Sequence, residues 1–403
     1  MKYEFLKNLY YKDPSIFNEE IKKRLNSDCV YKLDVAINGN RAFFLRTPDL
    51  YETAIKIIET DNKLYDLYIS LPPVAINQYI NKSLIGEITG TNDIEQIHSS
   101  RSEVNEVLVM GKSAKNKRFI DIINRYDMLG REKLKLNSCK DVRKIFDDLL
   151  SLEIEKEDAS NLPDGELFRR SGVNVHTATD KIIHKGIQPE SAIIDCMTKA
   201  LEFLNCNDVN FLFRIAIFHY LFGYIHPFYD GNGRTSRFIS SALIYENMRT
   251  DILAFRLSYT IRQNINEYYK SFKVCNEPKN KGDLTPFVYM FFDMIIQAMD
   301  NLRDSLSEKN EKLVYYKERL PILPHFNNKH TSDVYYILLQ ARLFSEIGIN
   351  KDKLVHELKI SRGALDNCFK KIPPDLLTVK SVQRTRFYSL NLDRLDDLIS
   401  AND

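Results

Sequence analysis

The sequence predicts a mainly α-helical protein with small β elements, and three observations support this fold class. Long stretches repeat apolar residues at helical spacing, as in YETAIKIIETDNKLYDLYI at 51–69. Glycine and proline are scarce, with 14 and 13 among 403 residues, so few helices are interrupted. Runs with high β propensity are few and short. We therefore expect a helical body in which strands form only local pairs.

Length and composition indicate an ordinary globular protein of two or three domains. Apolar residues make up 44% and charged residues 28% of the chain, which excludes a disordered, collagen-like or disulfide-scaffold protein. The 57 basic and 55 acidic side chains nearly cancel, so any nucleic-acid surface must be local. The six cysteines form no CxxC pair, which predicts reduced thiols and no structural metal.

Neither the amino terminus nor the most apolar stretch has the features of a membrane-targeted segment. MKYEFLKNLYYKDP lacks the apolar core of a signal peptide. Residues 211–225 include Arg214 and His219, and they are fewer than the ~20 residues needed to cross a bilayer. We predict a cytoplasmic protein without membrane association, in which 211–225 form a buried helix.

The first 120 residues are expected to form an all-helical N-terminal region. Helical periodicity covers 51–69 and, after the break at Leu71-Pro72-Pro73, continues from 76 to 109. Residues 111–160 are highly charged and also helical. The first convincing strand pair lies only at 172–187, where VNVHTA and KIIHKGI flank Thr179-Asp180 and predict a hairpin.

A long helical region follows the hairpin and ends before a small separate module. Helices are expected at 193–204, 210–225 and 234–247, and helical sequence continues over 251–307 with a break at EPKNKGD. Pro321, Pro324 and the polar FNNKHTSD mark a boundary at 325–332. We therefore expect domains at 1–120, 121–325 and 331–403.

The module at 331–403 has the pattern of a winged helix-turn-helix domain. Two short helices at 352–358 and 361–372 precede LLTVKSVQRTRFYSL, which reads as two strands around a basic tip. The module holds eleven Lys or Arg against ten Asp or Glu, so it is hardly basic overall. DNA binding and docking or dimerisation with protein therefore stay open as alternatives. A basic face for DNA would comprise Arg362, Lys370, Lys371, Lys380, Arg384 and Arg386.

One segment between two apolar helices, HPFYDGNGRTSR at 226–237, combines several groups that bind phosphate. The glycine-bearing turn at 230–233 lets backbone amides approach an anion, and the helix that Arg234 opens adds its dipole. Arg234 and Arg237 are three residues apart on one helical face, so both guanidinium groups can bind phosphate oxygens. The segment predicts a polyphosphate site.

Two further groups in this segment suit catalysis with a nucleotide. Asp230 is the one carboxylate in the turn, and Mg²⁺ is typically held by one or two carboxylates together with nucleotide phosphates. His226 ends the preceding helix and is suited to accept a proton from a hydroxyl. Each residue alone is readily explained as a helix cap or a solvated face, but their combination in this order favours a nucleotide site.

The segment resembles the signature of Fic-domain proteins, HPFx[D/E]GNGRxxR, at every specified position. INEYYKSF, with Tyr268 and Tyr269, and DLTPFVYMF from Asp283 are similar to further landmarks of the family, so the resemblance covers about 50–400. It implies a Fic-type helical catalytic core and a protein adenylyltransferase. Such an enzyme transfers AMP from MgATP to a Ser, Thr or Tyr hydroxyl of a protein target.

The resemblance also assigns roles to residues. His226 would be the general base and Asp230 the Mg²⁺ ligand. The hairpin at 172–187 would be the flap, whose edge pairs with the target segment. The nucleotide would be bound by Gly231, Asn232, Gly233, Arg234, Arg237, Tyr268 and Tyr269.

Many Fic proteins also carry an inhibitory helix with the pattern [S/T]xxxE[G/N], whose glutamate pairs with the second arginine of the signature. TNDIEQ at 91–96 fits with Glu95, although Gln96 departs from the pattern, and SSRSEV at 99–104 fits less well with Glu103. We expect both glutamates on a helix and an ion pair between Glu95 and Arg237. In some relatives this glutamate also supports removal of AMP.

Other readings stay open at this point. A phosphotransferase branch of the family usually has Lys where this chain has Gly233, which argues for AMP transfer here. From another class, the chain would be a transcription regulator in which the winged helix binds DNA and the Fic core senses nucleotide. Candidate targets include other proteins and the protein itself. A homodimer is one option for the oligomeric state.

Overall fold

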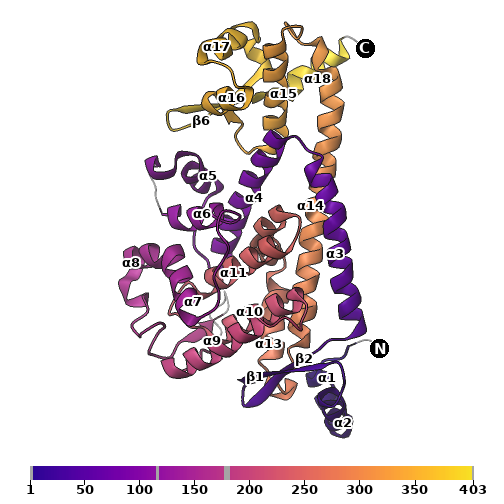
Figure 1. The fold of residues 1–403 in the computed structure, drawn as a ribbon, viewed down its shortest axis with the longest axis vertical. Helices are drawn as coiled ribbons and strands as arrows, with labels where there is room; N and C mark the ends of the chain where they lie inside the picture. Colours follow the sequence, from indigo (N-terminus) through magenta and orange to yellow (C-terminus); the bar gives the residue numbers. More distant parts are fainter. Residues whose placement is uncertain (1–2, 115–117, 177–181, 402–403) are drawn as a thin grey trace. The chain divides into compact units, whose positions relative to one another are not determined.

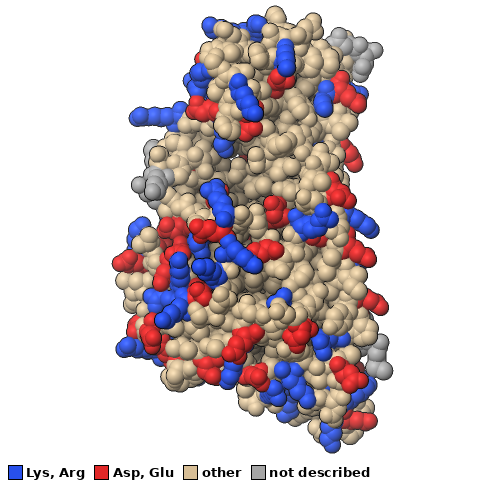
Figure 2. Space-filling model, in the orientation of Figure 1, with Lys and Arg blue, Asp and Glu red and all other residues tan. Residues whose placement is uncertain are grey.

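The computed structural model describes residues 3–114, 118–176 and 182–401. These residues are mostly helical and include three small antiparallel sheets, which confirms the predicted fold class (Figure 1). The chain divides into two compact units. The first comprises Met1–Asn62 and Gly86–Met299, and the second comprises Lys63–Ile85 and Asp300–Asp403. On the face shown in Figure 2, basic and acidic side chains are interspersed, as the balanced net charge leads one to expect.

The front of the chain is not all-helical, so that prediction was wrong. Helices α1 (Leu6–Lys12) and α2 (Pro14–Leu25) are followed by a hairpin of β1 (Val30–Ile37) and β2 (Asn40–Leu45). Asn38 and Gly39 join the strands with positive φ angles of 47° and 77°, which a two-residue hairpin turn requires. Leu33, Val35 and Ile37 alternate into the core. This Asn-Gly turn between alternating runs is the sequence signal that was overlooked.

Three helices follow, with two interruptions. Helix α3 (Pro48–Ile69) ends at the predicted break, and α4 (Pro73–Ile94) begins with Pro73 at its first position. The helix expected at 76–109 is divided, because α4 ends at Ile94 and α5 (Arg101–Met110) begins after a new cap at Ser100. The side chain of Ser100 accepts a hydrogen bond from the Glu103 N–H, and Glu103 bonds back to the Ser100 N–H in a capping box.

A set of short elements leads into the body of the first unit. These are α6 (Ile120–Asp127), α7 (Cys139–Phe146), a π-helical turn (Asp147–Ser151) and α8 (Leu152–Asp158). Strands β3 (Asn174–His176) and β4 (Ile182–Lys185) then pair within the predicted hairpin. Its expected tip, Thr179-Asp180, lies outside the described residues.

The centre of the first unit is α10 (Phe211–Ile225), which packs against α9 (Glu190–Leu204) and α11 (Asn232–Asn247). Almost every side chain of α10 is buried, as the sequence predicted. A 3-10 turn (Asp251–Arg256), α12 (Leu257–Gln263), α13 (Ile265–Cys275), a second 3-10 turn (Pro278–Asn280) and the 35-residue α14 (Thr285–Arg319) follow. In the described part of the chain, no helix has the length and hydropathy needed to span a membrane.

The second unit contains the end of the chain. After a 3-10 turn (Leu320–Ile322), its elements are α15 (Lys329–Phe344), β5 (Ile349–Asn350), α16 (Lys351–Leu358), α17 (Arg362–Lys371), a 3-10 turn (Pro374–Leu376), β6 (Leu377–Val382), β7 (Thr385–Leu390) and α18 (Leu392–Ser400). The three strands form a sheet in the order β5-β7-β6. The two short helices and the final strand pair lie where the sequence predicted them. Gln340 of α15 accepts a hydrogen bond from the Ala75 N–H, which ties the module to the N-terminal half of α4.

Candidate active site

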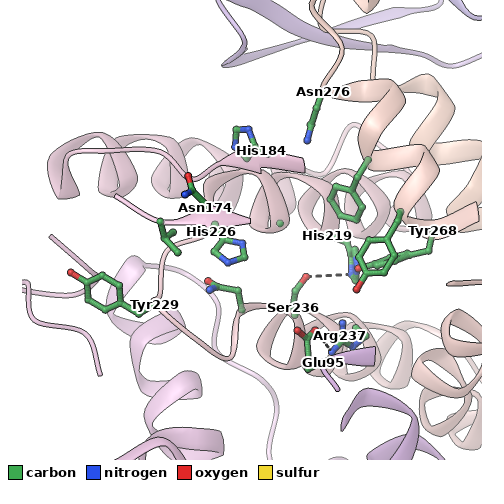
Figure 3. Close-up of a pocket in the computed structure, with 16 residues that line it drawn as sticks. Glu95, Asn174, His184, His219, His226, Tyr229, Ser236, Arg237, Tyr268 and Asn276 are labelled. Atoms are coloured by element: carbon green, nitrogen blue, oxygen red, sulfur yellow. Dashed lines mark hydrogen bonds and ion pairs between the residues drawn. The ribbon is translucent and has the colours of Figure 1, made fainter. Parts of the chain in front are cut away.

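A cavity of about 230 Å³ in the first unit gathers most of the predicted site residues. Its walls come from the β3–β4 hairpin, the ends of α10 and α4, the first turns of α11, and α13 (Figure 3). The predicted site residues that line it are Glu95, His226, Asn232, Gly233, Arg237, Tyr268 and Tyr269. Asp230, Gly231 and Arg234 are not among the lining residues, and the reasons differ for each of them.

His226 caps the carboxyl end of α10 in a left-handed conformation with φ 53°. Its N–H donates to the Phe222 carbonyl, and its own carbonyl accepts a hydrogen bond of 2.9 Å from the buried guanidinium of Arg169. Burial lowers the pKa of His226 to about 4, although the negative charge of Glu95 partly opposes this shift. The imidazole is therefore neutral at pH 7 and able to accept a proton.

The turn after His226 is fixed by Asn232 and Phe228. The Asn232 side chain accepts a hydrogen bond from the Phe228 N–H at 2.9 Å and donates one to the Phe228 carbonyl at 2.8 Å. The Phe228 ring is fully buried and stacks on Phe146 at a centroid distance of 3.9 Å. Gly231 has φ 77°, and a Cβ added there would come within 2.6 Å of Leu150. Gly231 thus lets the turn pack closely and brings the amino end of α11 to the cavity.

Asp230 lies at the edge of this turn, and its side chain is 41% exposed. One carboxylate oxygen accepts a hydrogen bond from the Gly231 N–H, and the other is 3.5 Å from the Arg234 guanidinium. The described residues contain no group of three or more metal-binding side chains. A single, partly exposed carboxylate beside amides that favour phosphate suits an ion such as Mg²⁺, which takes its remaining ligands from phosphate and water.

The two arginines of the signature are both 1% exposed, but they have different partners. Arg234 donates a hydrogen bond of 3.1 Å to Glu153 of α8 and does not line the cavity. Arg237 does line it and donates to the Thr91 hydroxyl, the Thr91 carbonyl and the Glu95 carboxylate, at 2.8, 3.1 and 2.7 Å. The expectation that both side chains reach the same space therefore fits Arg237 alone.

Glu95 lies in a turn just after α4, and not on a helix as expected. Its carboxylate is 2.7 Å from Arg237, and its side chain is 31% exposed. Burial alone would raise the pKa of Glu95, but the charge and hydrogen bond of Arg237 hold it below the usual value. Gln96 has φ 59°, which explains why glycine or asparagine is usual at this position of the family pattern.

Two further observations distinguish Glu95 from the alternative glutamate, Glu103. A Cβ added at Gly233 would lie 1.9 Å from a Glu95 carboxylate oxygen, so Glu95 fills the space beside the first turn of α11. The alternative residue, Glu103, uses its carboxylate to cap α5 at Ser100. The contact with Arg237 is therefore made by Glu95.

A buried polar network behind the cavity was not foreseen. His219 of α10 lies within hydrogen-bond distance of the Ser240 hydroxyl and the Tyr268 hydroxyl, at 2.8 Å each. Burial lowers the pKa of His219 to about 3 and raises the pKa of Tyr268, so both groups are neutral. Burial likewise raises the pKa of Tyr269 to about 12. His219 lies seven residues, about two helical turns, before His226, and this spacing is the sequence signal that could have identified it.

The hairpin contributes Asn174 and His184 to the cavity, and neither was singled out in the sequence. His184 lies 2.8 Å from the Tyr224 carbonyl, and its ring stacks on the Tyr224 ring at a centroid distance of 4.2 Å. Burial lowers the pKa of His184. Figure 3 shows His184 beside Asn276, above His226. The site is therefore a neutral histidine, a helix amino terminus and one cavity-lining arginine, enclosed by a hairpin.

Comparison with known proteins assigns this site to a class. Residues 139–244, which contain the signature and the hairpin, match the sequence model of the Fic/DOC family. The protein therefore carries a Fic/DOC family domain. The shared fold extends further, because a Fic family protein from Desulfovibrio desulfuricans G20 superposes with a TM-score of 0.53 at 19% identity, over 86% of this chain and 96% of that one.

Curated relatives resemble a smaller part of the chain. A protein named protein adenylyltransferase Fic from Drosophila yakuba is 35% identical over 85 residues, and its counterpart from Drosophila grimshawi is 32% identical over 107 residues. These matches cover 21% and 26% of this chain. They span only 15% and 20% of the length of those relatives.

Proposed function

We propose that the protein is a cytoplasmic protein adenylyltransferase that transfers AMP from MgATP to a Ser, Thr or Tyr hydroxyl of a protein target. The observation that carries the proposal is the position of His226, a neutral base that lines one cavity together with Gly233 at the amino end of α11 and with Arg237. The name of the curated relatives supports the same reaction class. The protein itself is one candidate target.

In the proposed reaction, His226 takes the proton of the target hydroxyl as its oxygen bonds to the α-phosphorus of ATP. The bond from that phosphorus to the oxygen that bridges to the β-phosphate breaks, and pyrophosphate leaves. The backbone of residues 231–233 and the Arg237 guanidinium would hold the phosphates and stabilise their charge, and Arg234 would join them on leaving Glu153. Asp230 would hold Mg²⁺, which supplies further neutralisation of phosphate charge.

The β3–β4 hairpin would position the target. An extended segment can add to a free strand edge through backbone hydrogen bonds, and this would bring a hydroxyl beside His226. Tyr268 and Tyr269, which line the cavity and keep their protons, would form the wall for the nucleotide.

Glu95 would restrain this activity. With Glu95 bound to Arg237 and filling the space beside Gly233, the guanidinium is not available to the terminal phosphates of ATP. Displacement of Glu95 would release the arginine. The same carboxylate, 2.7 Å from Arg237 and close enough to His226 to influence its pKa, could also direct water in the reverse reaction, so we extend the proposal to removal of AMP.

The experiment is incubation with α-labelled ATP and Mg²⁺, followed by measurement of protein-bound label. We expect weak labelling by wild type, strong labelling by Glu95→Gly and none by His226→Ala. Glu103→Gln is the matched control, because the Glu103 carboxylate caps α5 at Ser100 and glutamine can replace glutamate in a capping box. Equal labelling by wild type and His226→Ala would overturn the assignment of the base.

A second function, DNA binding, is favoured by the order of α16, α17, β6 and β7, which is that of a winged helix-turn-helix domain. Lys380, Arg384 and Arg386 are exposed on β6, β7 and the turn between them, whereas Arg362 is paired with Asp352. In this reading the Fic domain senses nucleotide and the second unit binds DNA. The test is DNA binding by the full chain and by the double variant Arg384→Ala/Arg386→Ala across a range of salt concentrations. An affinity that changes neither with salt nor with the double substitution would exclude DNA binding through this face.

A further inference from the structure

The β1–β2 hairpin reaches the candidate active site through its tip. The backbone N–H of Asn38 donates a hydrogen bond of 3.0 Å to the Tyr224 hydroxyl. The Asn38 side-chain amide donates one of 2.5 Å to the Asn276 carbonyl. Asn38 thus connects α10 to the end of α13 through Tyr224 and Asn276, which lie more than fifty residues apart in the chain.

Both contacts lead directly to residues that line the cavity. The ring and carbonyl of Tyr224 hold His184 of the hairpin β3–β4, by stacking and by a hydrogen bond of 2.8 Å. Asn276 itself lines the cavity, and its side-chain carbonyl accepts a hydrogen bond of 2.6 Å from the Tyr220 hydroxyl. Asn38, His184 and Asn276 also share the lining of a neighbouring cavity of about 530 Å³. The tip therefore lies at the end of the site where Figure 3 shows His184 and Asn276.

We propose that Asn38 is a positioning residue for the nucleotide site, and that the β1–β2 hairpin braces the cavity wall formed by His184 and Asn276. The hairpin is suited to this task because it is held at both ends. Phe43 of β2 donates to the Gly282 carbonyl, and the Phe43 carbonyl accepts from the Leu284 N–H. These bonds fix the base of the hairpin to the segment between α13 and α14, so the tip has a defined position.

The proposal rests on the proposed function only in that the cavity binds a nucleotide. It predicts that loss of the Asn38 amide loosens the wall and weakens nucleotide binding, without any change at His226. A role of Asn38 in the turn alone predicts something different. Asparagine, aspartate and glycine all accept the positive φ of this position, so Asn38→Asp and Asn38→Gly would then both behave as wild type.

The test compares Asn38→Gly and Asn38→Asp with wild type and with the control Asp34→Ala, an exposed residue of the same hairpin. The first readout is amide hydrogen exchange over 182–185 and 272–277, which requires no nucleotide. The second is the dissociation constant for MgATP, measured by calorimetry. A failure to transfer AMP would end the proposed function but would leave both readouts valid.

We expect faster exchange in both segments and about 3- to 10-fold weaker MgATP binding in Asn38→Gly, which loses the side-chain bonds to the Asn276 carbonyl and the Tyr224 hydroxyl. Asn38→Asp should be affected more, because it turns a carboxylate oxygen toward the Asn276 carbonyl. Asp34→Ala should match wild type in both readouts. Exchange or affinity in Asn38→Asp equal to that of wild type overturns the proposal.

Discussion

The segment 226–237 and the N-terminal residues that reach it differ in how they are built. The segment is continuous in sequence, and hydrogen bonds within it fix its conformation, such as those between the Asn232 side chain and the Phe228 backbone. Glu95 and Asn38, by contrast, belong to distant elements. Glu95 bonds to Arg237, and Asn38 bonds to Tyr224 and Asn276 beside the site. The comparison suggests that the chemistry is encoded locally, whereas its restraint and alignment depend on long-range packing.

The largest effect is expected from the local segment, at His226. Replacement by alanine removes the proposed base and should lower AMP transfer by about 10²- to 10⁴-fold, the usual contribution of a positioned acid or base. Labelled AMP incorporation in the Glu95→Gly background measures this, because the starting rate is then high. MgATP binding should persist in the variant, and a rate close to that of the parent would contradict the assignment.

The next effect concerns the long-range contact at Glu95. Glu95→Gly frees Arg237 and should raise AMP transfer by at least about tenfold, which corresponds to about 1.4 kcal/mol, the scale of one charge-assisted hydrogen bond. Glu95→Gln tests the charge separately, since it keeps the size of the side chain, and it should give an intermediate rate. The rates are measured at saturating MgATP. A Glu95→Gly rate no higher than wild type means that the contact does not restrain the enzyme.

The pH dependence links the two regions. Because the pKa of His226 is lowered to about 4, the neutral base persists as pH falls through the usual histidine range, and the acid limb of the transfer rate should lie near pH 4. Glu95 raises the pKa of His226, so Glu95→Gly should move this limb to lower pH. A pH–rate profile of both proteins at constant ionic strength measures the shift. An acid limb near pH 6.5 would show that His226 is as solvated as a free histidine.

The smallest effect is expected at the cap of α5. Ser100→Ala removes the side-chain acceptor of the capping box and should lower the free energy of unfolding by about 1 kcal/mol, as measured by urea denaturation. AMP transfer should stay within a factor of two of wild type, because no residue of α5 is among the described residues that line the cavity. A large gain in transfer would instead indicate that the 95–100 turn holds Glu95 in place.

The sequence predicted the local parts of the molecule and missed those that depend on distant contacts. The order of groups in 226–237 identified the turn, the helix start and Arg237, because these features are fixed by residues close in the chain. It could not show that Arg234 turns to Glu153, which lies more than eighty residues upstream. The bonds of Asn38 to Tyr224 and Asn276 also join residues that are far apart in the chain, so the sequence could indicate only the Asn-Gly turn.

Two misses have other causes. Glu95 was expected on a helix, but α4 ends at Ile94 and the chain turns at Glu95 and Gln96, where Gln96 has a positive φ. His219 was read as part of a buried helix, which is correct, but its bonds to Ser240 and Tyr268 join residues from three helices. Such networks are set by tertiary packing, and helical periodicity indicates only which face of α10 they occupy.

The roles of His226 and Glu95 are tested together by AMP incorporation in Glu95→Gly and in Glu95→Gly/His226→Ala, with α-labelled ATP and Mg²⁺. We expect strong labelling by the single variant, above that of wild type, and a return to background in the double variant. Labelling that is absent from both, or equal in both, would contradict an adenylyltransferase that uses His226 and is restrained by Glu95.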